Sequence, residues 1–361
     1  MGQKSATLTL YSIGHALIDF LSVATLFQSI SLDASLSREL AGVLILFYDL
    51  AAFALQPLFG MLVDLRRWQR SIAIVGCLLV ASGFLWMDTP FLAVTFVGVG
   101  NAMYHVGGAV AALRITPGKA GPAGAFVAPG TLGLCAGIVC GPIIGFPLGL
   151  LALAVLLLAF LIHCNGERGQ VSDEEMVTKA VKFSPMLANN LVLLVLVAVG
   201  LRSVIGNLAG FTWKSNPLTE TLLTYGALVF GAEFLGKLFG GYIADRFGWA
   251  RTLTLAMILA TVLLPLGFLV DDEAGVLAGL FGVSMFNIAM PITLIVVVNL
   301  LPGREGFAFG LTAFVLIAAA LPWFMGMVPP AKYPAVPLAL VTGAATLLLW
   351  WCLRRYNKIT T

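Results

Sequence analysis

Seven residues that can carry a charge lie inside long apolar runs of this sequence, and they are the first candidates for chemistry. A charged side chain costs roughly 3 kcal/mol or more at the centre of a bilayer, so such residues are kept mainly in cavities or in pairs. The seven are His15, Asp19, Asp49, His105, Arg202, Glu233 and Lys237.

His15 and Asp19 are four residues apart, so they share one face of a helix. Asp19 and His105 each lie about 15 Å from the nearer end of their runs, so they reach similar depths. Imidazole gains and loses a proton near neutral pH, and a carboxylate can exchange that proton with it. We predict that Asp19, His15 and His105 carry protons; the alternative is a pair that only joins helices. Asn101 and Tyr104, expected on the same face as His105, are candidate substrate-binding residues.

Arg202 is the only cation deep in its run. Arginine keeps its charge and recognises carboxylate or phosphate-like groups with a planar fork. Arg202 is therefore a candidate for binding an anionic group of a substrate, or else it neutralises a carboxylate such as Asp49 or Asp19. Asp49, whose partner the sequence does not identify, is a further candidate substrate-binding residue.

Glu233 and Lys237 are also four residues apart, which favours an ion pair along one helix. Neutralisation is the first interpretation of this pair. The alternatives are proton coupling by Glu233 and substrate binding by Lys237. Asn287 is a candidate for a hydrogen bond to a substrate, although a role in helix packing explains it equally well.

The composition shows which elements must position these residues. Hydrophobic residues make up 60% of the chain and charged residues 10%, and the mean hydropathy is +1.01, whereas about 25% of the residues of a soluble domain are charged. A helix needs about 20 apolar residues to cross a bilayer, and the alternating strands of a closed barrel are not seen. We predict an all-α integral membrane protein with twelve transmembrane helices, at roughly 8–30, 38–63, 71–88, 91–114, 122–146, 148–164, 184–212, 219–244, 252–270, 274–300, 304–328 and 337–353.

Two stretches with the same pattern lie about half of the 361-residue chain apart. Each has a glycine, three residues, an aspartate and then arginines, and such a half-length repeat is typical of transporters. An aspartate at a helix end can reach the N-terminus of a neighbouring helix and hold one state closed. We predict this gating role; the alternative is a solvated basic turn that only sets orientation. The residues are Gly60, Asp64, Arg66, Asp245, Arg246 and Arg251.

The polar residues define the domains and the orientation. We expect an N-terminal six-helix bundle at 1–164, a cytoplasmic interdomain loop at 165–183 and a C-terminal six-helix bundle at 184–361. With both termini cytoplasmic, fifteen lysines and arginines lie inside and three outside, as the positive-inside rule requires. The expected location is the cell (cytoplasmic or inner) membrane, and the net charge of +3 reflects this placement rather than nucleic-acid binding.

Other classes of function are disfavoured. The loops are too short to hold a nucleotide-binding domain, so neither ATP nor another cofactor is expected. The five cysteines match no zinc pattern, and with three histidines no Ser-His-Asp or metal constellation stands out, so we expect neither an enzyme nor a metal site. A receptor or scaffold that does not transport would not need titratable residues deep in both halves.

The paired stretches, the twelve runs and the central loop resemble the major facilitator superfamily. This resemblance implies two pseudo-symmetric six-helix bundles, in which the first, fourth, seventh and tenth helices line a central cavity. The second stretch matches the signature of the superfamily, including Gly248. The first departs from it, with Leu65 where an arginine is usual and Arg67 where a glycine is usual.

Four further motifs lie along the chain, at His15-x3-Asp19, Leu55-Gln56-Pro57-x2-Gly60-x3-Asp64, Gly98-x-Gly100-x4-His105 and Leu301-Pro302-Gly303-Arg304-x-Gly306-x3-Gly310-Leu311. In this order they resemble the fosmidomycin-resistance group of these transporters, whose members are efflux pumps thought to exchange substrate for protons. Val94 stands where the superfamily often has an arginine. Glycines at 133, 137, 141 and 145 are expected to line one helix face, as in an antiporter motif, although tight helix packing explains them equally well.

The sequence thus predicts a proton-coupled antiporter that exports small organic molecules, including anionic or drug-like ones, by alternating access. It is expected to act as a monomer in the lipid bilayer. The alternative within transporters is a proton-coupled importer of an organic anion or metabolite, because direction is poorly encoded in the sequence.

Overall fold

A computed structural model shows the all-helical architecture that the sequence predicts. Twelve segments are long and apolar enough to cross a membrane, and no strand occurs in the described part of the chain. The structure describes residues 2–33, 35–143, 145–172, 185–213, 222–270, 272–328 and 333–360, and for 185–189, 209–213, 222–226 and 360 it describes the backbone.

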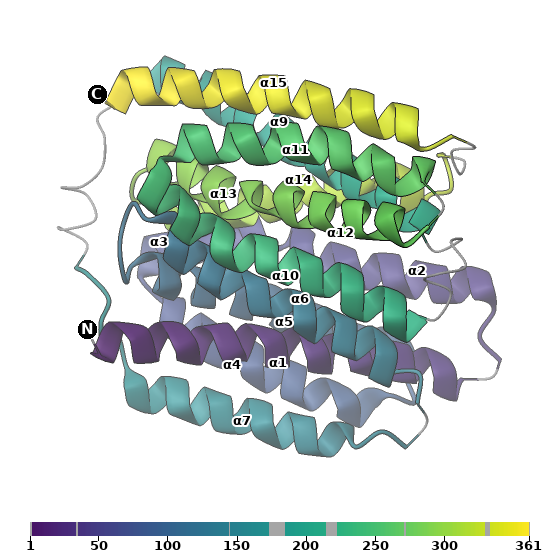
Figure 1. Ribbon diagram of the computed structural model, residues 1–361. Coiled ribbons are helices and arrows are strands. Elements are labelled where there is room, and N and C mark those ends of the chain that lie inside the picture. The colour runs from purple at the N-terminus through teal and green to yellow at the C-terminus, as the bar shows by residue number, and fades with distance from the viewer. Residues whose placement is uncertain are drawn as a thin grey trace. The chain divides into compact units, whose positions relative to one another are not determined.

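Six of these segments come from the first half of the chain (Figure 1). The second of them is continuous through a π-helical turn at Leu50–Ala54. The helices are α1 (Gly2–Leu32), α2 (Arg38–Asp49), α3 (Gln56–Arg66), α4 (Gln69–Gly83), α5 (Pro90–Leu113), α6 (Ala120–Cys140) and α7 (Leu148–Asn165).

The second half supplies the other six segments. One of them is divided at Ile288, where Pro291 cannot donate a backbone hydrogen bond to the carbonyl four residues earlier. The helices are α9 (Pro185–Trp213), α10 (Leu222–Phe247), α11 (Trp249–Leu269), α12 (Glu273–Asn287), α13 (Ala289–Leu300), α14 (Glu305–Phe324) and α15 (Ala335–Thr360).

The outward faces of these helices are apolar, as contact with lipid requires. On α7, Leu150 is 67% exposed and Phe160 is 61% exposed. On α15, Leu347 is 69% exposed. The core of a bilayer contains no water, so exposed apolar side chains are expected on helices that span it.

The chain forms two compact units. One comprises residues 1–117, 126–178 and 303–314, and the other comprises 118–125, 179–302 and 315–361. The beginnings of α6 and α14 are therefore each grouped with residues from the other half of the chain. Residues 173–183 of the expected interdomain loop lie outside the described residues, and the division into bundles at 1–164 and 184–361 remains a prediction.

The glycine series of α6 is explained in part by tight packing. A Cβ atom at Gly133 would collide with the carbonyl oxygen of Ala16, and one at Gly137 would lie 2.6 Å from Cβ of Val23, so α6 packs closely on α1. Gly141 directly follows the end of α6 and still lies on this face, because a Cβ atom there would lie 2.9 Å from Cα of Ala24 on α1. Gly145 does not belong to this face, because it lies beyond the helix with a φ of 85° and a Cβ atom there would meet nothing within 4 Å. The expectation that all the glycines line one helix face is therefore wrong for Gly145.

Candidate functional site

His15, Asp19 and His105 form one buried cluster between α1 and α5. The Nε2 atom of His15 lies 3.3 Å from Oδ2 of Asp19, and the Nε2 atom of His105 lies 3.4 Å from Oδ1. Asn101 donates a hydrogen bond from Nδ2 to Oδ1 of Asp19 at 2.8 Å. The structure thus brings together four of the residues singled out in the sequence.

Backbone carbonyls hold both imidazole rings. Nδ1 of His15 lies 2.8 Å from the carbonyl oxygen of Phe126, and Nδ1 of His105 lies 2.8 Å from that of Asn101. Because a carbonyl oxygen can only accept a hydrogen bond, each Nδ1 must carry the hydrogen. The second ring nitrogen of each histidine, Nε2, is then directed at the carboxylate of Asp19.

The surrounding helices fix the cluster by close approach. The His15 and His105 rings meet edge to face with their centroids 4.3 Å apart. Gly130 of α6 leaves room for the pair, because a Cβ atom there would collide with Nε2 of His15 and lie 2.6 Å from Oδ2 of Asp19. Phe53, in the π-helical turn, places its ring 6.5 Å from that of His105. Such turns are often found at functional sites.

The same three side chains could also reach a cation. His15, Asp19 and His105 offer one ligand atom each, and these atoms lie within 4.8 Å of one another. This arrangement was not expected from the sequence, in which no metal pattern stands out. Its chemistry suits either a shared proton or a metal ion, and metal binding can be measured directly.

Two of the predicted residues of this unit lie apart from the cluster. Tyr104 is fully buried and donates a hydrogen bond to the carbonyl oxygen of Tyr11 at 2.9 Å, so it joins α5 to α1. Asp49 ends α2, immediately before the π-helical turn, and is partly exposed. Among the described residues, its carboxylate has no hydrogen bond or ion pair.

Arg202 is a buried cation on α9, with 7% of its surface exposed. Its guanidinium carbon lies 5.1 Å from the ring centroid of Phe286 on α12, which is a cation–π contact. Its Nε atom has no hydrogen-bond acceptor within the described residues. Arg202 therefore has an apolar support and one unused donor, and the negative charge of Glu233 also acts on it. Both anion binding and neutralisation of a carboxylate fit this environment, so substrate binding by Arg202 stays a prediction.

Glu233 and Lys237 form the ion pair that their spacing predicts. Nζ of Lys237 donates a hydrogen bond to Oε2 of Glu233 at 2.9 Å along α10. Asn287 donates to the carbonyl oxygen of Val283 on its own helix at 2.9 Å. These contacts support a neutralising role for the pair and a structural role for Asn287, and they leave substrate binding by either as a prediction.

The aspartate of the first repeated stretch binds a helix N-terminus. Asp64 accepts hydrogen bonds from the backbone N–H groups of Gly306 and Phe307, both at 2.8 Å, in the first turn of α14. Gly60 allows this contact, since a Cβ atom there would collide with the carbonyl oxygen of Gly306. The carboxylate thus satisfies two free donors and lies at the positive end of the helix dipole.

The aspartate of the second stretch does the same at another helix. Asp245 accepts hydrogen bonds from the N–H groups of Ala120 at 3.0 Å and Gly121 at 2.8 Å, in the first turn of α6. It also accepts one from Nε1 of Trp249 at 3.0 Å. The predicted contact of an aspartate with a neighbouring helix N-terminus therefore occurs twice.

The predicted gating arginines are less engaged than the aspartates. Arg66 and Arg246 are exposed and lie over neighbouring aromatic rings, those of Trp68 at 5.8 Å and Phe247 at 5.5 Å. Arg251 is exposed as well. Each of these environments fits the solvated basic turn that was the alternative interpretation, so the gating role of the arginines stays a prediction.

Sequence reasoning missed Glu305. This residue begins α14, is only 2% exposed and pairs through Oε2 with the buried Arg114 at 3.3 Å and with Arg67 at 3.8 Å. The feature of the sequence that could have identified Glu305 is its position inside the Leu301–Leu311 motif, between Arg304 and Gly306. Its burial with two arginines marks it as part of the same end of the molecule as Asp64.

Comparisons with known proteins bear on the fold. No family model and no curated protein sequence matches the chain. Among solved structures, the E. coli fucose:proton symporter FucP matches with a TM-score of 0.66 and 13% identity, covering 95% of this chain and 97% of that one. The human organic anion transporter MFSD10 matches with a TM-score of 0.70 and 14% identity, covering 96% and 99%.

A bacterial homologue of the iron transporter ferroportin matches with a TM-score of 0.65 and 17% identity, covering 98% of this chain and 99% of that one. These three structures are each described as a transporter or a transporter homologue. Identities this low establish a shared fold and not a shared substrate or direction. A second structure of FucP is described as a major facilitator superfamily transporter, and this chain has the same twelve-span fold.

Proposed function

We propose that this chain is a proton-coupled secondary transporter that exports small organic molecules in exchange for protons by alternating access. The observation that carries the proposal is the His15–Asp19–His105 cluster, buried in a fold that other transporters share. Export rests on the motif resemblance to the fosmidomycin-resistance group. The chain acts in the cell membrane with both termini cytoplasmic.

The cluster is built to hold an added proton. With hydrogen on each Nδ1, a neutral imidazole presents a lone pair at Nε2 to an oxygen of Asp19, and two acceptors facing one another repel. A proton on either Nε2 turns that contact into a charge-assisted hydrogen bond and neutralises the carboxylate. A proton on Nε2 of His105 therefore stabilises the contact between α5 and α1, whereas a proton on Nε2 of His15 stabilises a contact within α1.

Release of the proton has the opposite effect. Without it, the amide of Asn101, at 2.8 Å, is the only partner among the described residues that stabilises the charge of Asp19, because both Nε2 atoms then repel it. An uncompensated carboxylate in a buried site is costly, so α1 shifts to let it reach water. The 15% exposure of the Asp19 side chain gives protons a route to this carboxylate. Coupling arises because the protonated and unprotonated clusters favour different positions of α1.

The substrate carries an anionic group in this proposal. Arg202 keeps its charge, lies buried and has an unused Nε donor, so a carboxylate or phosphate-like group would complete its environment. The fold match to MFSD10, described as an organic anion transporter, agrees with such a substrate. Small anions should compete for binding in the unaltered protein, and Arg202→Gln should remove the competition.

The test is flux in proteoliposomes under an imposed pH gradient, with substrates chosen by a thermal-shift ligand screen. Asp19→Asn keeps the shape of the side chain and the acceptor for Asn101, so it should fold and yet lose transport driven by the gradient. Asp33→Asn is the matched control, because Asp33 only accepts hydrogen bonds from Ser35 beyond the end of α1. Undiminished gradient-driven transport by Asp19→Asn would remove the cluster from the mechanism.

The second candidate is a proton-coupled importer of an organic anion or metabolite. The buried Arg202 favours an anionic substrate in either direction, and the same fold can run both ways. In vesicles of known orientation, substrate movement opposite to the proton gradient supports export, whereas movement together with protons supports import. Equal flux in the presence and absence of a gradient would exclude both coupled mechanisms.

A further inference from the structure

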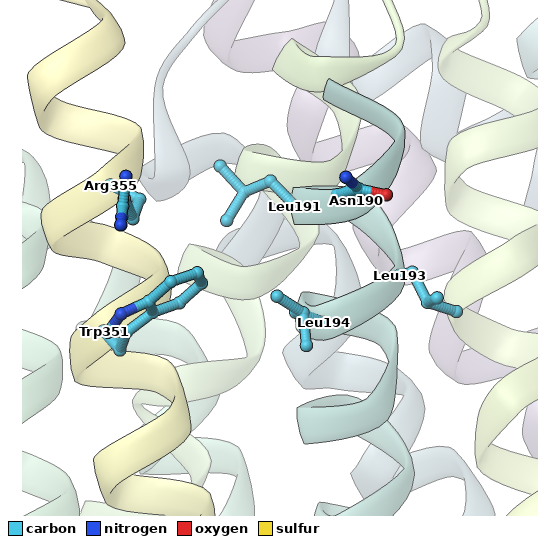
Figure 2. A pocket seen from close by; sticks show the side chains of 6 residues that line it. All are labelled: Asn190, Leu191, Leu193, Leu194, Trp351 and Arg355. Carbon is cyan, nitrogen blue, oxygen red and sulfur yellow. The ribbon is translucent and has the colours of Figure 1, made fainter. Parts of the chain in front are cut away.

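A groove on the second compact unit is unrelated to the residues discussed so far. It lies between α9 and α15 and has a volume of about 440 Å³. Figure 2 shows the side chains that line it, which come from both helices. They are Asn190, Leu191, Leu193, Leu194, Trp351 and Arg355.

The groove has a polar end and an apolar end. Asn190 and Leu194 are four residues apart on α9, as are Trp351 and Arg355 on α15, so each pair spans about 6 Å along its helix. In Figure 2, Asn190 and Arg355 lie at one level, and Leu194 and Trp351 lie about one turn further along. Both helices therefore change from polar to apolar in the same direction.

The polar end is positively charged. Arg355 is exposed, and its guanidinium carbon lies 5.1 Å from the ring of Trp351, which supports it from one side. Within the part of the chain that the structure describes, no carboxylate pairs with it. Arg354 and Lys358 lie on the same last turns of α15 and add to the charge.

We propose that this groove binds one anionic glycerophospholipid of the cytoplasmic leaflet. The phosphate lies at Arg355 with Asn190 as a second donor, and an acyl chain lies along Leu194, Leu193 and Trp351. A phospholipid has the same order of charge and apolar chain as the groove, and anionic lipids gather at basic segments beside the membrane. Tryptophan at the level of the headgroups is typical of such an interface.

The alternatives each leave part of the groove unexplained. A small soluble anion would use Arg355 and leave the apolar end, including the 61% exposed Leu193, uncovered. A zwitterionic lipid would cover the apolar end, but its own cationic group would offset the attraction of its phosphate to Arg355. An arginine that no described carboxylate pairs with, followed by an apolar continuation of the groove, is the combination that selects an anionic lipid.

The test compares ligands on the full chain after delipidation in detergent. Native mass spectrometry and thermal unfolding are measured with phosphatidylglycerol, with phosphatidylcholine and with inorganic phosphate alone. We expect one phosphatidylglycerol to bind per chain and to raise the Tm, with a weaker effect of phosphatidylcholine and none of phosphate. Equal effects of the two lipids, an effect of phosphate alone or a dimer that closes the groove without lipid would each overturn the proposal.

Two adjacent arginines supply a matched pair of variants. Arg355→Gln removes the charge that lines the groove and should weaken phosphatidylglycerol binding roughly tenfold or more. Arg354→Gln removes the same charge from a residue that does not line it and instead lies over Trp350 at 4.1 Å. Both side chains are exposed, so both variants should fold. Equal losses in the two variants would show general charge attraction and contradict a site.

A second matched pair of variants tests the apolar end of the groove. Leu193→Gln should weaken binding of phosphatidylglycerol, because Leu193 lines the groove. Leu347→Gln, at a similarly exposed position on α15 that does not line it, should leave binding unchanged. Unchanged binding of phosphatidylglycerol in Leu193→Gln would contradict the placement of the acyl chain.

Discussion

Arg67 and Gly248 occupy the same position in the two repeated stretches, three residues after Asp64 and Asp245, and both have a positive φ. The φ of Arg67 is 57° and that of Gly248 is 93°. Arg67 ends α3 in the left-handed region, and Gly248 separates α10 from α11. The turn after the signature aspartate thus needs a left-handed residue in both copies, although only the second copy supplies a glycine.

Replacing Arg67 by glycine should leave the stability unchanged or slightly higher. A left-handed residue other than glycine costs about 1–2 kcal/mol. The ion pair of Arg67 with Glu305, at 3.8 Å and with Arg67 37% exposed, is worth about 1 kcal/mol or less. Relief of strain therefore at least balances the lost pair. Arg67→Ala loses the pair and keeps the strain, so its Tm should fall below that of Arg67→Gly. Equal Tm values of the two variants would contradict strain at this position.

Adding a methyl group at Gly130 should abolish coupled transport. The Cβ atom of Gly130→Ala would collide with His15 and lie 2.6 Å from Oδ2 of Asp19, so the cluster must separate to admit it. We expect loss of flux driven by the pH gradient. Gly42→Ala on α2 is the control, because nothing lies within 4 Å of the added Cβ atom, and it should retain flux. Normal gradient-driven flux in Gly130→Ala would show that the cluster need not stay closed.

The composition of the spans made most of the fold predictable. A helix satisfies its backbone hydrogen bonds within its own segment, so long apolar runs separated by short polar breaks predict helices in a bilayer. All twelve predicted runs are found as helical segments. The His15–Asp19 pair was predictable because four-residue spacing places both side chains on one helix face. The equal depth of His105 then pointed to a single site.

The rest of the site depends on tertiary contacts that residue types do not encode. The carbonyl oxygen of Phe126 has no signature in a sequence, and Gly130 resembles any other glycine of an apolar run. Glu305 looks like an ordinary acid beside a basic loop, because nothing local shows that Arg114 will bury it. The sequence predicts Tyr104 on the same face as His105, but adjacent residues on a helix point about 100° apart, and the hydroxyl of Tyr104 turns to Tyr11.

Breaking the Arg114–Glu305 pair from one side should destabilise the protein strongly. Both side chains are at least 94% buried, so Glu305→Gln leaves Arg114 as a buried charge with a weakened partner, at a cost of about 3–5 kcal/mol. The double variant Arg114→Met with Glu305→Met removes both charges and should recover most of the loss in Tm. If the loss in the double variant equals the sum of the losses in the single variants Arg114→Met and Glu305→Met, the pair is not coupled.

Variants of the Glu233–Lys237 pair can distinguish charge neutralisation from proton coupling. If the pair only cancels charge, Glu233→Gln leaves Lys237 charged inside the span and lowers Tm and flux. The loss in stability should be smaller than the roughly 3–5 kcal/mol that follows when one partner of a fully buried pair is removed, because the side chain of Glu233 is 29% exposed.

Glu233→Gln with Lys237→Met removes both charges, and we expect it to restore flux driven by a pH gradient to near its original level. If Glu233 instead carries protons, the double variant must fail as Asp19→Asn does, since no titratable group replaces it. Proteoliposome flux with and without the gradient distinguishes these outcomes. Gradient-driven flux that stays lost while the Tm recovers would move Glu233 from charge balance into the coupling mechanism.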